Sequence, residues 1–84
     1  MCTSGVNAAQ FKMMLEQMDD QIALNRRWTH KMFHSADDNG YEKTAATLKE
    51  AQGLLDEVRA LLTDAQDAFD KDQEKLADVT VTLV

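Results

Sequence analysis

The chain has 84 residues, a net charge of −6, one cysteine and no proline. This length allows one small domain, and the acidic balance disfavours direct nucleic-acid binding, because phosphate contacts need a basic surface. The single cysteine, Cys2, cannot form an intrachain disulfide, and we find no membrane span or secretory signal. We therefore expect a cytoplasmic protein with neither a membrane nor a nucleic acid among its partners. Because helix-forming residues dominate, we predict an all-α fold.

The first predicted helix covers residues 7–34. Asn7 is a favourable N-cap, Gln10 completes a capping box, and Val6 with Phe11 can form a hydrophobic staple. Apolar residues then recur at alternating spacings of three and four, which is typical of a helix packed lengthwise against another. The predicted seam contains Ala8, Phe11, Leu15, Met18, Ile22, Asn25, Thr29 and Met32, and is widened by Met14, Trp28 and Phe33.

A turn is predicted at residues 35–39, where Asp, Asn and Gly in HSADDNG oppose helix propagation. The second helix is predicted over residues 40–78, with Asn39 as its N-cap and Glu42 as the partner in a capping box. Its seam has the same spacing and contains Tyr41, Thr44, Leu48, Ala51, Leu55, Val58, Leu62, Ala65, Phe69, Asp72, Leu76 and Val79, and is widened by Leu54, Leu61 and Ala68.

The second helix is predicted to be longer than the first, and two arrangements can accommodate the difference. A break near Thr63, where TDAQ offers another capping box, would produce a three-helix bundle. Because the seam passes residue 63 without a change of phase, we favour one continuous helix. The last residues, 79–84, read VTVTLV, and we expect them to form a tail outside the helix.

The fold expected for residues 1–84 is thus a single domain, a long antiparallel hairpin that resembles a coiled coil. A two-helix hairpin with such wide apolar stripes cannot cover both edges of each stripe by itself. We therefore predict that it dimerises into a four-helix bundle, or that it forms a complex with another helical protein.

The stretch RRWTHKMFHSADDNG, residues 26–40, contains the candidate site residues. For partner binding we select Arg26, Arg27, Trp28 and Phe33, because Trp and Arg are enriched at interaction hot spots. The structural alternative is that the arginines pair with carboxylates of the second helix, for which Glu42 and Glu50 are the reachable candidates.

Two histidines four residues apart share one helix face and suggest a metal site as the alternative function. The ligands would be His30, His34, Asp37 and Asp38. Histidines near the end of a helix also interact favourably with its negative pole, so the main prediction contains no metal and no cofactor.

No nucleophile–base pair, glycine-rich phosphate loop or paired-carboxylate cleft is evident, so we predict neither enzymatic activity nor catalytic residues. The stretch MDDQIALNRR is similar to the first helix of chorismate mutases, but its Asp-to-Arg spacing is shorter than in that family. The size and shape resemble those of helical-hairpin secretion proteins, although Trp28 lacks the W-x-G turn of one such group. The expected function is that of an acidic interaction module: an adaptor, a secretion-type chaperone or an inhibitor of a larger protein.

Overall fold

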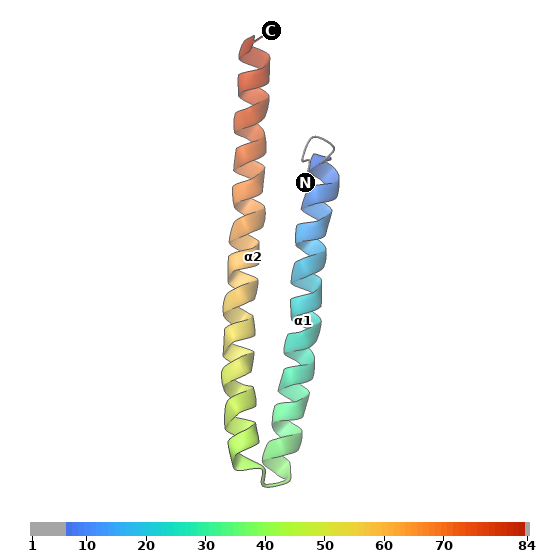
Figure 1. Ribbon diagram of the computed structural model, residues 1–84, viewed down its shortest axis with the longest axis vertical. Coiled ribbons are helices and arrows are strands. Elements are labelled where there is room, and N and C mark those ends of the chain that lie inside the picture. Colours follow the sequence, from blue (N-terminus) through green and yellow to red (C-terminus); the bar gives the residue numbers. More distant parts are fainter. Residues whose placement is uncertain (1–6, 84) are drawn as a thin grey trace, which may run out of the picture.

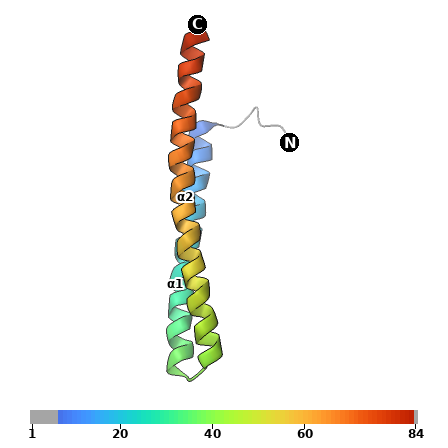
Figure 2. The ribbon, with the colours of Figure 1, turned by 90° about the vertical axis from the view of Figure 1, so that its left-hand side faces the viewer.

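The computed structural model describes residues 7–83, with side chains described as far as Leu76. It consists of two helices, α1 (Ala8–Asp38) and α2 (Glu42–Leu83), which lie antiparallel and pack along their length (Figure 1). The molecule measures 67 × 19 × 18 Å, and α2 projects beyond the start of α1 (Figure 2). The prediction of an all-α helical hairpin is confirmed. Within residues 7–83, neither helix is long and apolar enough to cross a membrane.

The start of α1 agrees with the sequence. The side-chain oxygen of Asn7 accepts hydrogen bonds from the backbone nitrogens of Ala9, at 2.8 Å, and Gln10, at 3.1 Å. These bonds satisfy amide groups that have no partner in the first turn of a helix, so the predicted N-cap is confirmed. The predicted staple involves Val6, which lies outside the described residues.

The turn between the helices is built around Gly40. Its φ of +78° is left-handed, a conformation that glycine adopts without steric cost. The nitrogen of Tyr41 donates to the carbonyl oxygen of Ala36 at 2.9 Å, and that of Gly40 donates to Asp37 at 3.2 Å. This pair of bonds is a Schellman motif, which satisfies the last carbonyl groups of α1.

The motif also changes the predicted role of Asn39. We expected Asn39 to cap the start of the second helix, but it is the C-cap of α1. Its side-chain nitrogen donates to the carbonyl oxygen of Ser35 at 2.7 Å. As a result, α1 continues four residues beyond the predicted end at residue 34, and α2 begins at Glu42.

The second helix has no break at Thr63, so the three-helix alternative is wrong. The hydroxyl of Thr63 donates to the carbonyl oxygen of Arg59 at 3.1 Å, a bond within a continuous helix and not a cap. The helix also continues through Leu83, beyond the predicted end at residue 78. Extending an existing helix through β-branched residues costs only a few tenths of a kcal/mol each, roughly, which is less than starting a new element.

The two helices meet along only one flank of each predicted stripe. On α1 the half-buried and buried contact residues are Lys12, Leu15, Asp19, Ile22, Ala23, Arg26, Thr29, Phe33 and Ala36. On α2 they are Ala45, Leu48, Ala51, Gln52, Leu55, Arg59, Leu62, Ala65, Gln66, Phe69 and Gln73. We call these residues the hairpin seam. Among the described side chains, only Ala36 and Ala45, both next to the turn, are buried.

The predicted seam is therefore confirmed for some of its residues and wrong for others. Leu15 and Ile22 do lie in the hairpin seam, but Met18 and Met32 are about half exposed, and so is Trp28 on the flank of the stripe. Apolar periodicity alone assigned all of these residues to one contact. In the structure, charged residues at the same spacing take part of the seam because they find partners across it.

Candidate protein interaction surface

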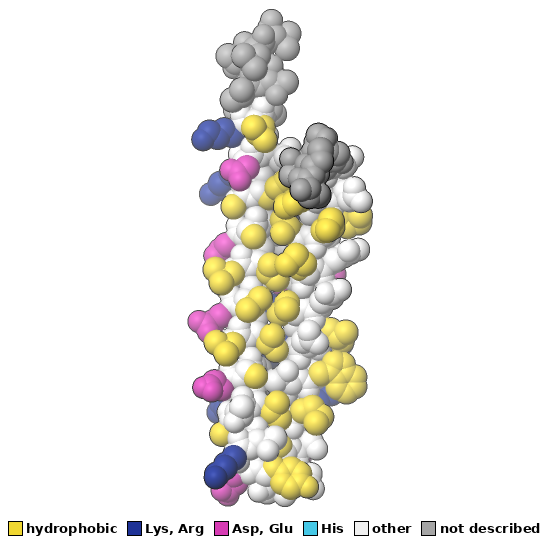
Figure 3. All heavy atoms as spheres, viewed as in Figure 1, with side chains coloured by type: hydrophobic (Ala, Val, Ile, Leu, Met, Phe, Trp, Pro, Cys, Tyr) yellow, Lys and Arg dark blue, Asp and Glu magenta, His cyan; other side chains and the backbone are white. Residues whose placement is uncertain are grey.

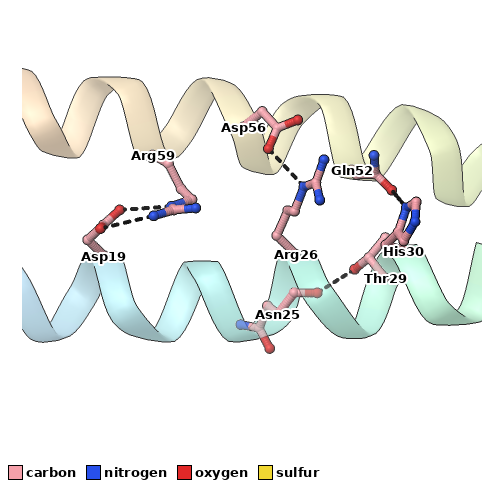
Figure 4. A network of polar contacts seen from close by, with 8 residues as sticks. All are labelled: Asp19, Asn25, Arg26, Thr29, His30, Gln52, Asp56 and Arg59. Carbon is pink, nitrogen blue, oxygen red and sulfur yellow. Dashed lines mark hydrogen bonds and ion pairs between the residues drawn. The ribbon is translucent and has the colours of Figure 1, made fainter.

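Three ion pairs join the helices across or beside the hairpin seam. Asp19 pairs with Arg59, whose Nε lies 3.1 Å from the carboxylate, and Arg26 pairs with Asp56 at 3.0 Å (Figure 4). Near the start of α1, the ammonium of Lys12 contacts both carboxylate oxygens of Asp70. These are the pairs Lys12–Asp70, Asp19–Arg59 and Arg26–Asp56.

Two of the ion pairs raise the pKa of their basic group. The hydrogen bond to Asp70 raises the pKa of Lys12 above its ordinary value, against a smaller opposing effect of desolvation. The hydrogen bond to Asp19 raises the pKa of Arg59 in the same way, with support from the negative charge of that carboxylate. Both cations therefore remain charged over a wider pH range in the folded chain than in the unfolded chain.

A second apolar stripe on each helix is only partly covered within the hairpin. Phe11 stacks on Phe69 with the ring centres 4.9 Å apart, and Ala51 and Ala65 also belong to the hairpin seam. On α1 it comprises Phe11, Met14, Met18, Trp28 and Met32, and on α2 it comprises Leu54, Val58 and Leu61 with Ala51, Ala65 and Ala68. The large side chains in this set are between 38% and 67% exposed. Figure 3 shows apolar side chains along one side of the molecule, over both helices. We call this set the apolar face.

The antiparallel pairing places both stripes on the same side. Each stripe lies on one flank of the hairpin seam, because its residues come directly before the seam residues in the sequence. In an antiparallel pair, flanks of the same type face each other across the contact. The two stripes therefore combine into one surface instead of lying on opposite sides of the molecule.

The residues predicted to bind a partner do not share one surface. Trp28 lies on the apolar face, with 55% of its surface exposed and the ammonium of Lys31 lying 5.0 Å from its ring centre. Phe33 is half-buried in the hairpin seam, and Arg27 is exposed outside both the seam and the apolar face. Arg26 pairs with Asp56, because the register brings that residue, and not Glu42 or Glu50, within reach.

The histidines meet on the flank of α1 that lies away from the apolar face. Their Nε2 atoms are 3.1 Å apart, and Nδ1 of His30 contacts the side-chain oxygen of Gln52 at 2.9 Å. Because that oxygen accepts, Nδ1 of His30 carries the proton, and Nε2 of His34 donates to His30 when both rings are neutral. Two convergent nitrogens offer a metal only half of a tetrahedral site.

The carboxylates proposed as further metal ligands do not complete the site. Asp37 and Asp38 are exposed in the last turn of α1. Within the described part of the chain, no three side chains of His, Cys, Asp or Glu come together as a metal-binding group. The structure therefore joins His30 with His34 but does not bring the other two proposed ligands to them.

The sequence predicted that each apolar stripe would keep an exposed edge, but it did not identify which residues form the apolar face. The predicted stripe was three residues wide per heptad, and the hairpin seam uses only part of that width. The excess width, seen at Met14 and Trp28 on α1 and at Leu54 and Leu61 on α2, was the available signal. Comparison of the chain with protein families, curated proteins and solved structures found no match.

Proposed function

We propose that the chain is a small acidic protein-interaction module whose apolar face packs on helices of another protein chain. An adaptor, a secretion-type chaperone and an inhibitor of a larger protein are the roles that suit such a module. The partner is a second copy, another helical protein, or each in turn, and it completes a bundle of at least four helices.

The exposed apolar face carries this proposal. Its side chains are too numerous to be scattered surface residues, and they form a continuous strip beside a seam that buries only two alanines. Covering apolar surface stabilises a structure by about 25 cal/mol per Å². A hairpin of this size has little other core to stabilise it, so a partner on this face supplies the missing burial.

The chemistry of the face also suits a protein partner. It combines one Trp with methionines and leucines, and its central region carries Gln21 and Asn25 but no charged group. Trp is enriched at interaction hot spots, and flexible methionines adapt to the shape of an opposing helix. Charged residues are confined to the edges, as in the polar rim of a typical interface.

Photo-crosslinking in cells tests this function whatever the identity of the partner. A photoreactive amino acid placed at Leu61, on the apolar face, is expected to form covalent adducts with a protein chain. The matched control carries the same photoreactive group at Ala60, which is exposed on the charged side of α2. The proposal fails if position 61 forms no adducts, or if position 60 forms the same adducts with equal yield.

A further inference from the structure

We infer that the apolar face is covered by a second copy of the chain, with the turns of both copies at the same end. In this arrangement α1 of each copy packs on α2 of the other, around a two-fold axis parallel to the helices. The inference rests on the proposed function, because it names the partner of the same face and the geometry of the contact.

The exposed area is sufficient for a stable dimer. The chain exposes 6795 Å², whereas a compact monomer of 9.4 kDa exposes about 5,000 Å². Stable protein interfaces bury about 800 Å² on each partner. The chain as a whole thus exposes more surface than a compact monomer of its mass, and part of this surface is the apolar face, whose large side chains are between 38% and 67% exposed.

Three polar contacts determine which residues of the two helices lie at the same height along the hairpin. These contacts are Lys12–Asp70, Arg26–Asp56 and His30–Gln52. The two residue numbers add up to 82 in each of these contacts. They add up to 78 in Asp19–Arg59, where the long arginine side chain extends along the helices to reach the carboxylate. A residue of α1 therefore lies level with the residue of α2 whose number brings the sum to about 82. In the same-end dimer the two-fold axis is parallel to the helices, so the same residues lie level between the two copies.

At these heights, the methionines of the apolar face on α1 lie close to alanines of α2, whereas Trp28 lies level with Leu54. Met14 is level with Ala68, Met18 lies within one residue of the height of Ala65, and Met32 lies within one residue of the height of Ala51. When α1 of one copy faces α2 of the other, each methionine meets an alanine. Large residues opposite small ones allow two helices to approach closely without leaving voids.

The middle of the face shows the converse pattern. Gln21 on α1 is level with Leu61 on α2, and Asn25 lies within one residue of the height of Val58. The polar residues of α1 thus meet the branched apolar residues of α2, whose bulk fills the space beside them. Apart from Trp28 and Leu54, the larger apolar groups of one helix thus lie near small or polar side chains of the other.

The opposite arrangement, with the turns at opposite ends, packs poorly. It places α1 on α1 and α2 on α2, related by a two-fold axis near Ala23, the midpoint of α1. Met14 would then face Met32 of the other copy, while Ala51 would lie close to Ala68. The two methionines would then meet along one pair of helices, and Ala51 and Ala68 would leave space along the other, where Leu54 lies near the height of Ala65.

Charges along the edges favour the same arrangement. The outer edge of α2 carries the exposed carboxylates Glu50, Glu57 and Asp64, and Figure 3 shows acidic side chains along that edge. In the same-end dimer, Lys31 of one copy lies within one residue of the height of Glu50 of the other. With the turns at opposite ends, Glu57 of one copy would instead lie about three residues from the height of Asp64 of the other, and like charges would repel.

Self-association is tested first, on the purified full chain by analytical ultracentrifugation. The wild-type protein is expected to sediment as a dimer, and Leu61→Glu to raise the dissociation constant by about a hundredfold, as charge insertion into an interface does. The matched control Ala60→Glu adds the same charge outside the face and is expected to keep the dimer. A helical protein that stays monomeric at all concentrations overturns the inference, even if crosslinking at position 61 captures another protein.

Spin-label distances then test the arrangement. In a Cys2→Ser background, a label at Asp38→Cys reports on the turns, and a label at Ala60→Cys, near the middle of the hairpin, shows whether the chains associate. Turns at the same end give an Asp38→Cys separation of about 20–30 Å, the width of a four-helix bundle. Turns at opposite ends give about 45 Å, and this result overturns the inferred geometry while leaving self-association intact.

Discussion

The two glycines that the structure describes occupy opposite kinds of backbone environment. Gly40 has a left-handed φ of +78° in the Schellman motif, whereas Gly53 lies inside α2. A methyl group added at either position would meet no atom within 4 Å. Any difference between alanine substitutions at these positions therefore reports backbone conformation and not steric crowding.

We expect Gly40→Ala to lower the free energy of unfolding by about 1–2 kcal/mol, because an L-residue is disfavoured in the left-handed region. Gly53→Ala should raise it by about 1 kcal/mol, because alanine loses less backbone entropy in a helix. Urea denaturation at one fixed protein concentration measures both variants. Changes of the same sign would contradict the predicted turn and helix assignments.

Lys12 gives a prediction about alkaline pH. Its pKa is raised by the hydrogen bond to Asp70, so folding is stabilised by the proton that the native chain retains. This contribution is complete below the unfolded pKa of about 10.4 and is lost as the pH rises through the higher folded value.

The free energy of unfolding of the wild type should therefore fall above pH 10 more steeply than that of Lys12→Met, which has no such proton. Lys12→Arg is the matched control, because it keeps a cation that remains protonated at this pH. Urea denaturation between pH 9 and pH 11.5 measures the three slopes. Parallel profiles for the wild type and Lys12→Met would show that the ion pair does not contribute to stability.

At the scale of the helices, the order of charges along the seam selects one register. Sliding α2 by one heptad in one direction would bring Lys49 to the place of Asp56 beside Arg26, and Gln52 to the place of Arg59 beside Asp19. Sliding it in the other direction would bring Thr63 and Gln66 to these places. Either wrong register loses these ion pairs, and one of them brings like charges together, so the polar residues specify pairing that apolar residues alone leave open.

The Asp19–Arg59 pair allows a direct test of this role. Asp19→Arg alone should destabilise the hairpin, because it places two guanidinium groups in contact across the seam. Adding Arg59→Asp restores opposite charges, and we expect the double variant to recover much of the lost stability. A double-mutant cycle measured by urea denaturation isolates the coupling between the two positions. Additive effects would show that this pair does not help to set the register.

Much of the helical architecture could be predicted from the sequence, because capping and heptad spacing are local signals. Asn7 was identified correctly, and the continuous phase through Thr63 indicated one long helix. The division of the wide stripe into a seam and an exposed face could not be predicted in this way. It depends on partners such as Arg26 and Asp56, which lie far apart in the sequence and meet only in the final register.

For the same reason, the candidate site was only partly predicted. Trp28 was selected for its residue type and does lie on the exposed face. Arg26 was selected on the same grounds but is engaged across the seam. Leu54 and Leu61 were assigned to the core because apolar residues at helical spacing usually pack there. The sequence indicates that such wide stripes exceed what a two-helix hairpin can cover, but only the three-dimensional arrangement shows which residues remain exposed.

At the scale of the whole molecule, the elongated shape makes the mode of association measurable. A single hairpin has a radius of gyration of 19.0 Å, which is dominated by its 67 Å length. Two copies packed side by side through the apolar face, with helix axes about 10 Å apart, have a radius of gyration of about 20 Å. Two copies joined end to end would have about twice the value of one hairpin. Side-by-side association therefore doubles the mass while leaving the radius of gyration almost unchanged.

Small-angle X-ray scattering of the purified chain over a dilution series measures both quantities at once. We expect the scattering mass to rise with concentration to that of two chains, with a radius of gyration near 20 Å throughout. In a separate thermal denaturation series, the melting temperature should rise with concentration. Leu61→Glu should keep a radius near that of one hairpin at the mass of one chain, unless the isolated hairpin unfolds and the radius increases. A dimer with a much larger radius would place the contact at the ends of the molecule, and the apolar face would then need a different partner.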